Sequence, residues 1–194
     1  MHAEHPLPDF YWTAETDMQC VRQVVKQVLE HGYAHHIQRL MVTGLYALVA
    51  GTQPWAIHEW YMGLFVDSYD WVTLPNTIGM SQFADGGVVA TKPYIASGRY
   101  VDRMSNYCSG CRFQPSKATG DDACPVTTLY WSYLMEHEDL LAANRRMGFQ
   151  VANLRRKSPE ERAEILKQRD AWLAKTLNTS SGDSPPPCSK GPSN

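Results

Sequence analysis

Residues 108–125 read CSGCRFQPSKATGDDACP, and this stretch decides how the rest of the chain is interpreted. Three cysteines stand in C-x2-C-x12-C spacing, and Pro125 follows the last of them. Thiolates that share one metal ion or cluster must converge, and a short C-x2-C turn brings two of them together locally. The polar loop after it returns Cys124 to the same place. The stretch therefore predicts a metal or cluster site with three local ligands.

The fourth ligand is left open among Cys20, Cys188 and a histidine. Cys188 stands in the sequence TSSGDSPPPCSKGPSN, whose composition is typical of disordered chain and costly to order. Cys20 falls in the first turn of a predicted helix, where backbone N–H groups and the helix dipole favour a thiolate or an anionic cluster. Cys20 is therefore the preferred fourth ligand.

Two occupants of the site compete on spacing alone. Zinc sites usually come as paired C-x2-C-like knuckles. A cubane [4Fe–4S] cluster takes four thiolates, and a Cys-Pro end is common around such clusters. A third possibility is that the cysteines bind nothing, although a loop this polar then has little reason to be ordered. Five cysteines that include C-x2-C indicate a metal or redox site in a reducing compartment, not a secreted disulfide framework.

Composition bounds the organisation of the chain. Its 194 residues, 43% of them apolar, suffice for one domain with a sizeable core, expected over residues 1–178 and followed by a disordered tail over 179–194. The formal net charge of −2 indicates no chain-wide basic surface, so DNA binding would need a local patch. With no long apolar run and no secretory signal, we expect no membrane span and a cytoplasmic location.

Apolar residues recur at helical spacing over most of the chain. The first predicted helix has Thr16 as the N-cap of a capping box and ends at Gly32. A second, over residues 35–49, is apolar on most of its surface and should be central in the core. A third begins with Thr52 as N-cap and Pro54 in its first turn.

Prolines and glycines interrupt the pattern over residues 67–104, which are expected to be long and irregular, and such stretches are usually functional. Helices are predicted again over residues 126–136 and 140–154, and after Ser158 as N-cap. The sequence thus predicts an all-α fold with long ordered loops.

Four segments carry a resemblance to a known family. The sequence is similar to the C-terminal part of the photolyase/cryptochrome superfamily, in the branch of iron–sulfur bacterial cryptochromes and photolyases, over about residues 10–176. That resemblance implies a helical FAD-binding domain, FAD, a [4Fe–4S] cluster and, in some members, repair of pyrimidine (6–4) photoproducts. The segments are EHGYAHHIQRLMV, FVDSYDWVTLPNTIGMSQFADGG, ATKPYIASGRYV and YCSGCRFQPSKATGDDACP.

The resemblance implies roles for individual residues. Arg39 resembles the family arginine that lies over the isoalloxazine ring and pairs with an aspartate, here Asp67, and Asp70 resembles a second aspartate near the flavin. Asn76, Met80, Ser81 and Gln82 are expected to line the same cavity. Without the motif, Arg39 and Asp67 would be interpreted as a plain structural ion pair. The implied cluster ligands are Cys20, Cys108, Cys111 and Cys124.

The same resemblance places His36 on the lesion side of the flavin, where a histidine can donate a proton. Tyr94 and Tyr100 are expected to line the lesion pocket. Two positions depart from the pattern. Leu40 stands where some (6–4) enzymes have a second histidine, and Thr73 stands where this branch often has an acidic residue near flavin N5.

Buried aromatics of this family pass electrons to excited FAD, and Trp60, Tyr61 and Trp12 resemble them, although core packing is the alternative for any of these rings. Four cationic side chains are expected to contact DNA phosphates as a local basic patch, and the alternative is that they are ordinary solvated surface residues. These are Lys92, Arg99, Arg103 and Arg112.

The family also has an N-terminal antenna domain and a first half of the helical domain, and neither is recognisable here. Three functions follow as expectations. The first is a (6–4) photolyase acting on UV-damaged DNA. The second is a blue-light-sensing cryptochrome that acts through a signalling partner protein. The third is a structural iron–sulfur or zinc domain without flavin.

Overall fold

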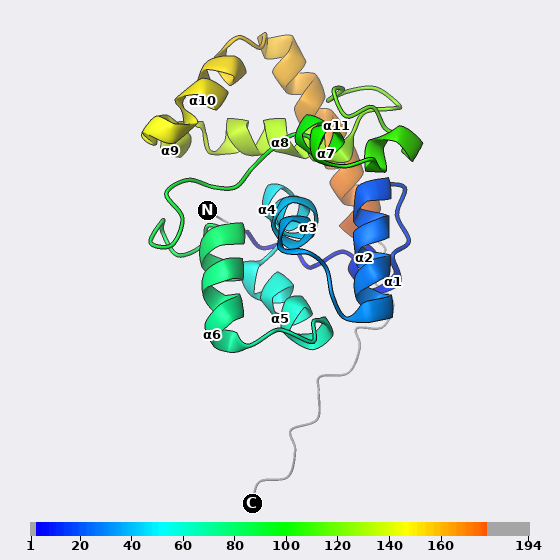
Figure 1. Ribbon diagram of the computed structural model, residues 1–194. Helices are drawn as coiled ribbons and strands as arrows, with labels where there is room; N and C mark the ends of the chain where they lie inside the picture. The colour runs from blue at the N-terminus through cyan, green and yellow to red at the C-terminus, as the bar shows by residue number, and fades with distance from the viewer. Residues whose placement is uncertain (1–2, 178–194) are drawn as a thin grey trace, which may run out of the picture.

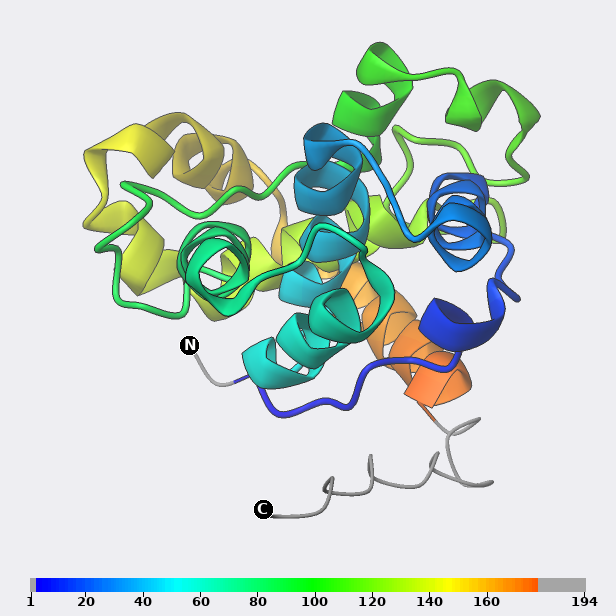
Figure 2. The ribbon, with the colours of Figure 1, turned by 60° about the horizontal axis from the view of Figure 1, so that its bottom comes forward.

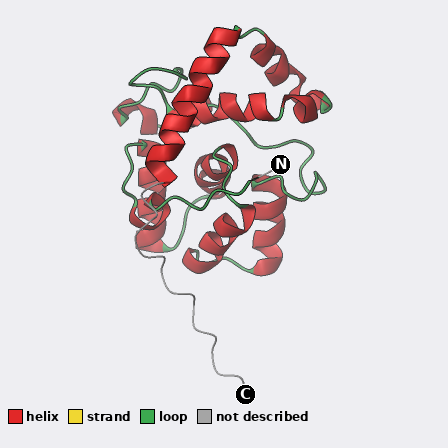
Figure 3. Cartoon of the chain, turned by 180° about the vertical axis from the view of Figure 1, so that it is seen from behind, coloured by secondary structure: helices red, strands yellow, loops and turns green. Residues whose placement is uncertain are grey.

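The computed structural model describes residues 3–177, and in that range the elements are all helices (Figure 3). The predicted all-α fold is confirmed. The tail predicted over residues 179–194 lies outside the described residues. Within the part described, no helix combines the length and the apolar character needed to cross a membrane.

The first half of the chain forms one group of helices, at the bottom of Figure 1. Helix α2 stands at one side of this group, the rod formed by α3, η1 and α4 lies near its middle, and α6 stands at the other side (Figures 1 and 2). The elements are α1 (Phe10–Thr13), α2 (Gln19–His31), α3 (His36–Gln38), the π-helix η1 (Arg39–Gly44), α4 (Leu45–Val49), α5 (Pro54–Leu64), α6 (Asp70–Thr73) and the π-helix η2 (Leu74–Ser81).

The second half forms a group above it. Helix α8 packs against α11 within this group and against α4 of the first group. The cysteine-bearing turn η3 packs against α2, so the two groups also meet at the cysteines. The elements are α7 (Gly98–Met104), η3 (Tyr107–Gly110), α8 (Pro125–Glu136), α9 (Glu138–Ala142), η4 (Arg145–Met147), α10 (Gly148–Arg155) and α11 (Pro159–Leu177).

The predicted central helix is confirmed as one continuous helical segment. All five residues of α4 are buried, because this stretch has no polar face to turn toward solvent. It ends where Gly51 takes a left-handed backbone (φ 68°), a conformation that glycine adopts without a Cβ penalty. Gly32 ends α2 in the same way, with φ 62°.

Two predicted helix starts are wrong by one or two residues. Helix α2 has Met18 as its N-cap, because the Thr16 hydroxyl accepts from the Met18 amide (3.3 Å) in a turn before the helix. Helix α5 has Gln53 as its N-cap, because the Thr52 amide still bonds back to the Ala47 carbonyl (2.9 Å). Pro54 does open α5, as predicted.

The expectation of an irregular stretch from residue 67 to 104 is wrong at both ends, where α6, η2 and α7 are helical. Helices α6 and η2 run without a break from Asp70 to Ser81. Pro75 is the second residue of η2 and does not interrupt them, although it supplies no N–H to the helical hydrogen-bond pattern. Residues 82–97 are irregular, as predicted.

The start of α11 is confirmed and is more complete than predicted. The Ser158 hydroxyl accepts from the Glu161 amide (3.2 Å), and the Glu161 carboxylate accepts from the Ser158 amide (2.9 Å). This reciprocal pair is a capping box and stabilises the helix that packs on α8.

Candidate functional site

The two π-helices border a cavity of about 230 Å³ in the first half of the molecule. Of the residues predicted for the site, six meet there: His36, Arg39, Tyr61, Asp67, Asn76 and Ser81. Its volume lies below the roughly 300–1,000 Å³ usual for a whole-ligand site, so this part of the chain has room for one end of a dinucleotide-sized ligand. The other lining residues are Tyr33, Leu40, Ser68, Val72, Thr73 and Thr77.

Arg39 is the fixed cation of this cavity. Its Nη2 donates to Asp67 Oδ2 (2.8 Å), and its Nε donates to the Ala34 carbonyl (2.7 Å). The guanidinium lies 4.3 Å from the centre of the Phe65 ring and 5.1 Å from that of Tyr33. Because the Asp67 side chain is 47% exposed, the ion pair contributes little to stability. Its main effect is to orient the guanidinium.

The wide turn of η1 brings the Arg39 carbonyl to the Tyr61 hydroxyl, which donates to it (2.8 Å) and also contacts Thr43 Oγ1 (2.8 Å). Burial raises the pKa of Tyr61 well above its usual value, so the hydroxyl keeps its proton. The two π-helices also approach closely, since a Cβ added to Gly44 would overlap Ser81 Oγ. π-Helical turns are frequent at functional sites.

Asp70, Tyr94 and Tyr100 lie outside the lining of this cavity. Asp70 begins α6 with a side chain that is 75% exposed, and its Oδ1 is 3.6 Å from Nε2 of the buried His58. Tyr94 stands in the loop before α7 and is 36% exposed. Tyr100 is on α7, where it packs on the core and lies under the Arg103 guanidinium at 5.8 Å.

The predicted electron-relay residues are divided between the interior and the surface. The Tyr61 ring lines the cavity and contacts the Trp60 ring (centroids 5.3 Å apart), which contacts Tyr11 in turn (5.1 Å). Trp60 is fully buried, and its indole N–H donates to the Tyr11 carbonyl (2.9 Å). Trp12 is 45% exposed on α1. Trp60 therefore contacts the buried rings of Tyr11 and Phe65 (5.6 Å), and sequence reasoning singled out neither as a relay member.

All four cysteines predicted as ligands line one small cavity. They come from three places in the chain: the first turn of α2, the η3 turn with the residue after it, and the N-cap of α8. None of the four forms a disulfide within the described residues. The rest of the wall is largely apolar, and the residues that form it are Met18, Gly98, Val101, Tyr107, Phe113 and Val126.

Burial raises the pKa of Cys20, and that of Cys108 to about 11, and neighbouring cysteines add to both shifts. Burial also raises the pKa of Cys124, although amides at the start of α8 act against it. Thiolates this deep need a cation to hold their charge. Within the described residues, no three His, Cys, Asp or Glu side chains are gathered closely enough for a single metal ion.

Gly98 forms part of the wall and leaves no room for a side chain. A Cβ there would lie 2.7 Å from Cys124 Sγ and 2.9 Å from Thr127 Oγ1. We therefore expect Gly98→Ala to displace Cys124 and to lower the free energy of unfolding by about 1–3 kcal/mol. Chemical denaturation measures this change. Gly110→Ala in η3 is the matched control, because a Cβ there meets nothing within 4 Å. Equal stability of the two variants would contradict this packing.

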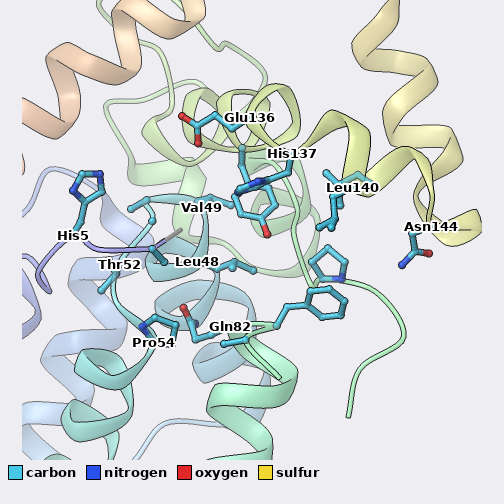
Figure 4. Close-up of a pocket in the computed structure, with 18 of the residues that line it drawn as sticks. His5, Leu48, Val49, Thr52, Pro54, Gln82, Glu136, His137, Leu140 and Asn144 are labelled. Atoms are coloured by element: carbon cyan, nitrogen blue, oxygen red, sulfur yellow. The ribbon is translucent and has the colours of Figure 1, made fainter. Parts of the chain in front are cut away.

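A larger cavity of about 1480 Å³ lies elsewhere, between the end of α4, the loop after η2 and the junction of α8 and α9 (Figure 4). Figure 4 shows Leu48 and Val49 on one side and Leu140 on another. Of the residues predicted for the site, Gln82 lines this larger cavity instead. We take the smaller cavity as the candidate site, because six of the residues predicted for the site line it.

Sequence reasoning missed some residues of both sites. Tyr33 stacks on Arg39 although it lies within a quoted motif, and an aromatic ring next to a motif arginine is the signal that could have found it. Tyr107 lies beside the first ligand cysteine and lines its cavity. Of the predicted basic patch, Arg112 pairs with Asp17 (3.0 Å).

Comparison with known proteins adds independent information. No protein-family model matches the sequence. The chain is 48% identical over 172 residues to a (6-4) photolyase of Agrobacterium fabrum, an alignment that covers 89% of this chain and 34% of that protein. It is 34% identical over 114 residues to the uncharacterized protein R855 of Acanthamoeba polyphaga mimivirus, covering 59% of this chain and 82% of that protein. The chain thus spans about a third of the photolyase's length.

Proposed function

Because the chain belongs to the photolyase-related family, we propose that it binds FAD at the Arg39 cavity and takes part in light-driven repair of pyrimidine (6–4) photoproducts in DNA. The observation that carries this proposal is the convergence of His36, Arg39, Asp67 and Asn76 on one cavity. UV-damaged DNA is the proposed substrate.

The residues of the cavity fit one end of a flavin. Bound FAD would supply light-driven one-electron transfer. The Arg39 guanidinium is held in place by its hydrogen bonds to Asp67 and to the Ala34 carbonyl. It offers a cation to the negative charge that a reduced flavin ring carries. Asn76 is oriented by its own hydrogen bond to the Val72 carbonyl (2.7 Å) and offers its amide to the ring edge. Leu40 and Val72 add apolar wall.

The relay is proposed to begin with Tyr61, which lines the cavity, and to continue through Trp60. Trp12 on the surface and Tyr11 in the interior are its candidate outer members. The assigned roles of Asp70, Tyr94 and Tyr100 remain proposals, and all three lie outside the cavity lining of this chain.

We propose a [4Fe–4S] cluster for the four cysteines. Each thiolate of a cubane binds a different iron, so the four need not gather as closely as around one ion. A single zinc ion would need four sulfurs at about 2.3 Å from one point. The support for one shared occupant is that all four thiols line the same cavity.

His36 is the residue that we propose donates the proton to the lesion. It opens α3 and lines the cavity beside Arg39, with its side chain exposed to an incoming substrate. Histidine exchanges protons near neutral pH, and general acid catalysis contributes about 10²–10⁴-fold to a rate. We therefore expect His36→Ala to lower the yield of repair per photon at least about a hundredfold with flavin content unchanged.

The test irradiates the flavin-loaded protein with blue light in the presence of an oligonucleotide that contains one (6–4) photoproduct. Chromatography of the digested oligonucleotide measures the loss of photoproduct against a dark sample. His31→Ala is the matched control, because His31 lies at the exposed end of α2, away from the cavity. Photoreduction of flavin without any loss of photoproduct would overturn repair and would favour the blue-light sensor.

A further inference from the structure

The side chain of Gln38 joins the cysteine centre to the candidate site. Its Oε1 accepts from the His35 amide (2.8 Å), while its Nε2 donates to the Tyr107 hydroxyl (2.9 Å) and to Gln27 Oε1 (3.2 Å). A carboxamide has two N–H donors, so both are used here. The orientation of this amide is therefore fixed from three directions.

Both side chains that accept from Gln38 belong to elements that carry a ligand cysteine. Tyr107 lies directly before Cys108 in η3 and lines the cysteine cavity. Gln27 stands on α2, whose first turn contains Cys20, and its Nε2 also donates to the Tyr33 carbonyl (3.1 Å). The elements of the cysteine centre therefore hold the start of α3 and the loop leading into it.

The start of α3 is also where the candidate site begins. His36 is its first residue, and Arg39 follows Gln38 directly as the first residue of η1. The turn is closed by a reciprocal capping box, in which His35 Nδ1 accepts from the Ile37 amide (3.2 Å) and Gln38 accepts from the His35 amide. A shift of Gln38 would therefore displace His36.

We propose that Tyr107 and Gln38 are positioning residues that couple the metal state of the cysteine centre to the placement of His36. When the thiols hold their metal, the η3 turn keeps the Tyr107 hydroxyl in position to accept the hydrogen bond from Gln38 Nε2. When they do not, η3 relaxes, this hydrogen bond is lost and the capping box at the start of α3 loosens. The inference rests on the proposed metal centre, but it does not require that the protein repairs DNA.

The test measures backbone hydrogen exchange in the peptide that spans residues 33–39. Wild type is compared before and after removal of its metal with a chelator, and Tyr107→Phe is measured in both states. Tyr130→Phe is the matched control, because Tyr130 is a partly buried tyrosine on α8. Iron and sulfide analysis of every sample establishes its metal state.

In wild type, we expect exchange over residues 33–39 to accelerate about fivefold when the metal is removed, the change that corresponds to one lost hydrogen bond. Tyr107→Phe should show the faster exchange with its metal still bound and respond little to metal removal. Tyr130→Phe should behave as wild type. Equal, slow exchange in metal-loaded wild type and Tyr107→Phe would overturn the positioning role.

A second pair of variants keeps the proposal testable if one of them does not fold. Gln38→Leu removes every hydrogen bond of the amide and should reproduce the fast exchange of Tyr107→Phe. Gln38→Glu keeps an acceptor for the His35 amide and can accept from the Tyr107 O–H, so we expect it to restore slow exchange. Fast exchange in both variants would contradict coupling through this bond. If wild type binds no metal at all, the coupling is overturned. If a metal-loaded chain fails to repair DNA, only the proposed activity is overturned.

Discussion

Cys20→Ala is expected to abolish metal binding and to lower the thermal midpoint of the chain by more than about 10 °C. Cys20 is buried on α2 in the first helix group. The other three ligands belong to the second group: Cys108 lies in η3, Cys111 directly follows it, and Cys124 is the N-cap of α8. The cysteine centre therefore joins the two helix groups, and a site that lacks one of four thiolates no longer joins them. Iron analysis and calorimetry measure the two losses.

The matched control for this prediction is Cys188→Ala. Cys188 is the fifth cysteine, lies outside the described residues and was the less preferred fourth ligand. We expect its replacement to leave both the iron content and the thermal midpoint unchanged. The reverse result, with iron retained in Cys20→Ala and lost in Cys188→Ala, would contradict the ligand set.

Arg39→Leu is expected to weaken flavin binding about 10- to 100-fold, because charge-assisted hydrogen bonds contribute roughly 1.5–3 kcal/mol. The change removes the cation, its bonds to Asp67 and Ala34, and its contact with the Phe65 ring. Stability should fall much less, because the ion pair with Asp67 is partly exposed. Flavin fluorescence released on denaturation, per mole of protein, measures retention.

Two further variants sharpen this prediction. Arg39→Lys keeps the charge but cannot reproduce both directed bonds of the guanidinium, so it should fall between wild type and Arg39→Leu. Arg156→Leu removes an arginine from the exposed end of α10 and should bind flavin as wild type does. Equal flavin affinity in wild type and Arg39→Leu would show that the ring binds elsewhere.

Much of the fold could be predicted from local signals. The central helix was found because the stretch around Leu45–Val49 lacks polar residues, and the last helix because Ser158 and Pro159 are strong start signals. Helix η2 was missed because Pro75 and the glycines near it indicate irregular chain. A π-helix depends on tertiary contacts, here the close approach of Gly44 to Ser81, and no local pattern predicts it.

The candidate site shows the same division. The cysteine spacing pointed to a shared site by itself, and the structure brings all four predicted thiols to one cavity. Arg39 and Asp67 are 28 positions apart, and only the family motif paired them. Tyr107 and Gln38 are 69 positions apart and belong to no metal or flavin pattern, so their hydrogen bond could be found only from the folded chain.

The most direct test of the central claim is the visible spectrum of the chain purified without oxygen, taken together with iron, sulfide, zinc and flavin analysis. We predict about four iron and four sulfide per chain with little zinc, as a cubane cluster requires. Flavin bands should be present in wild type and weakened by Arg39→Leu. A colourless chain that contains zinc and no flavin would contradict the assignment of both sites.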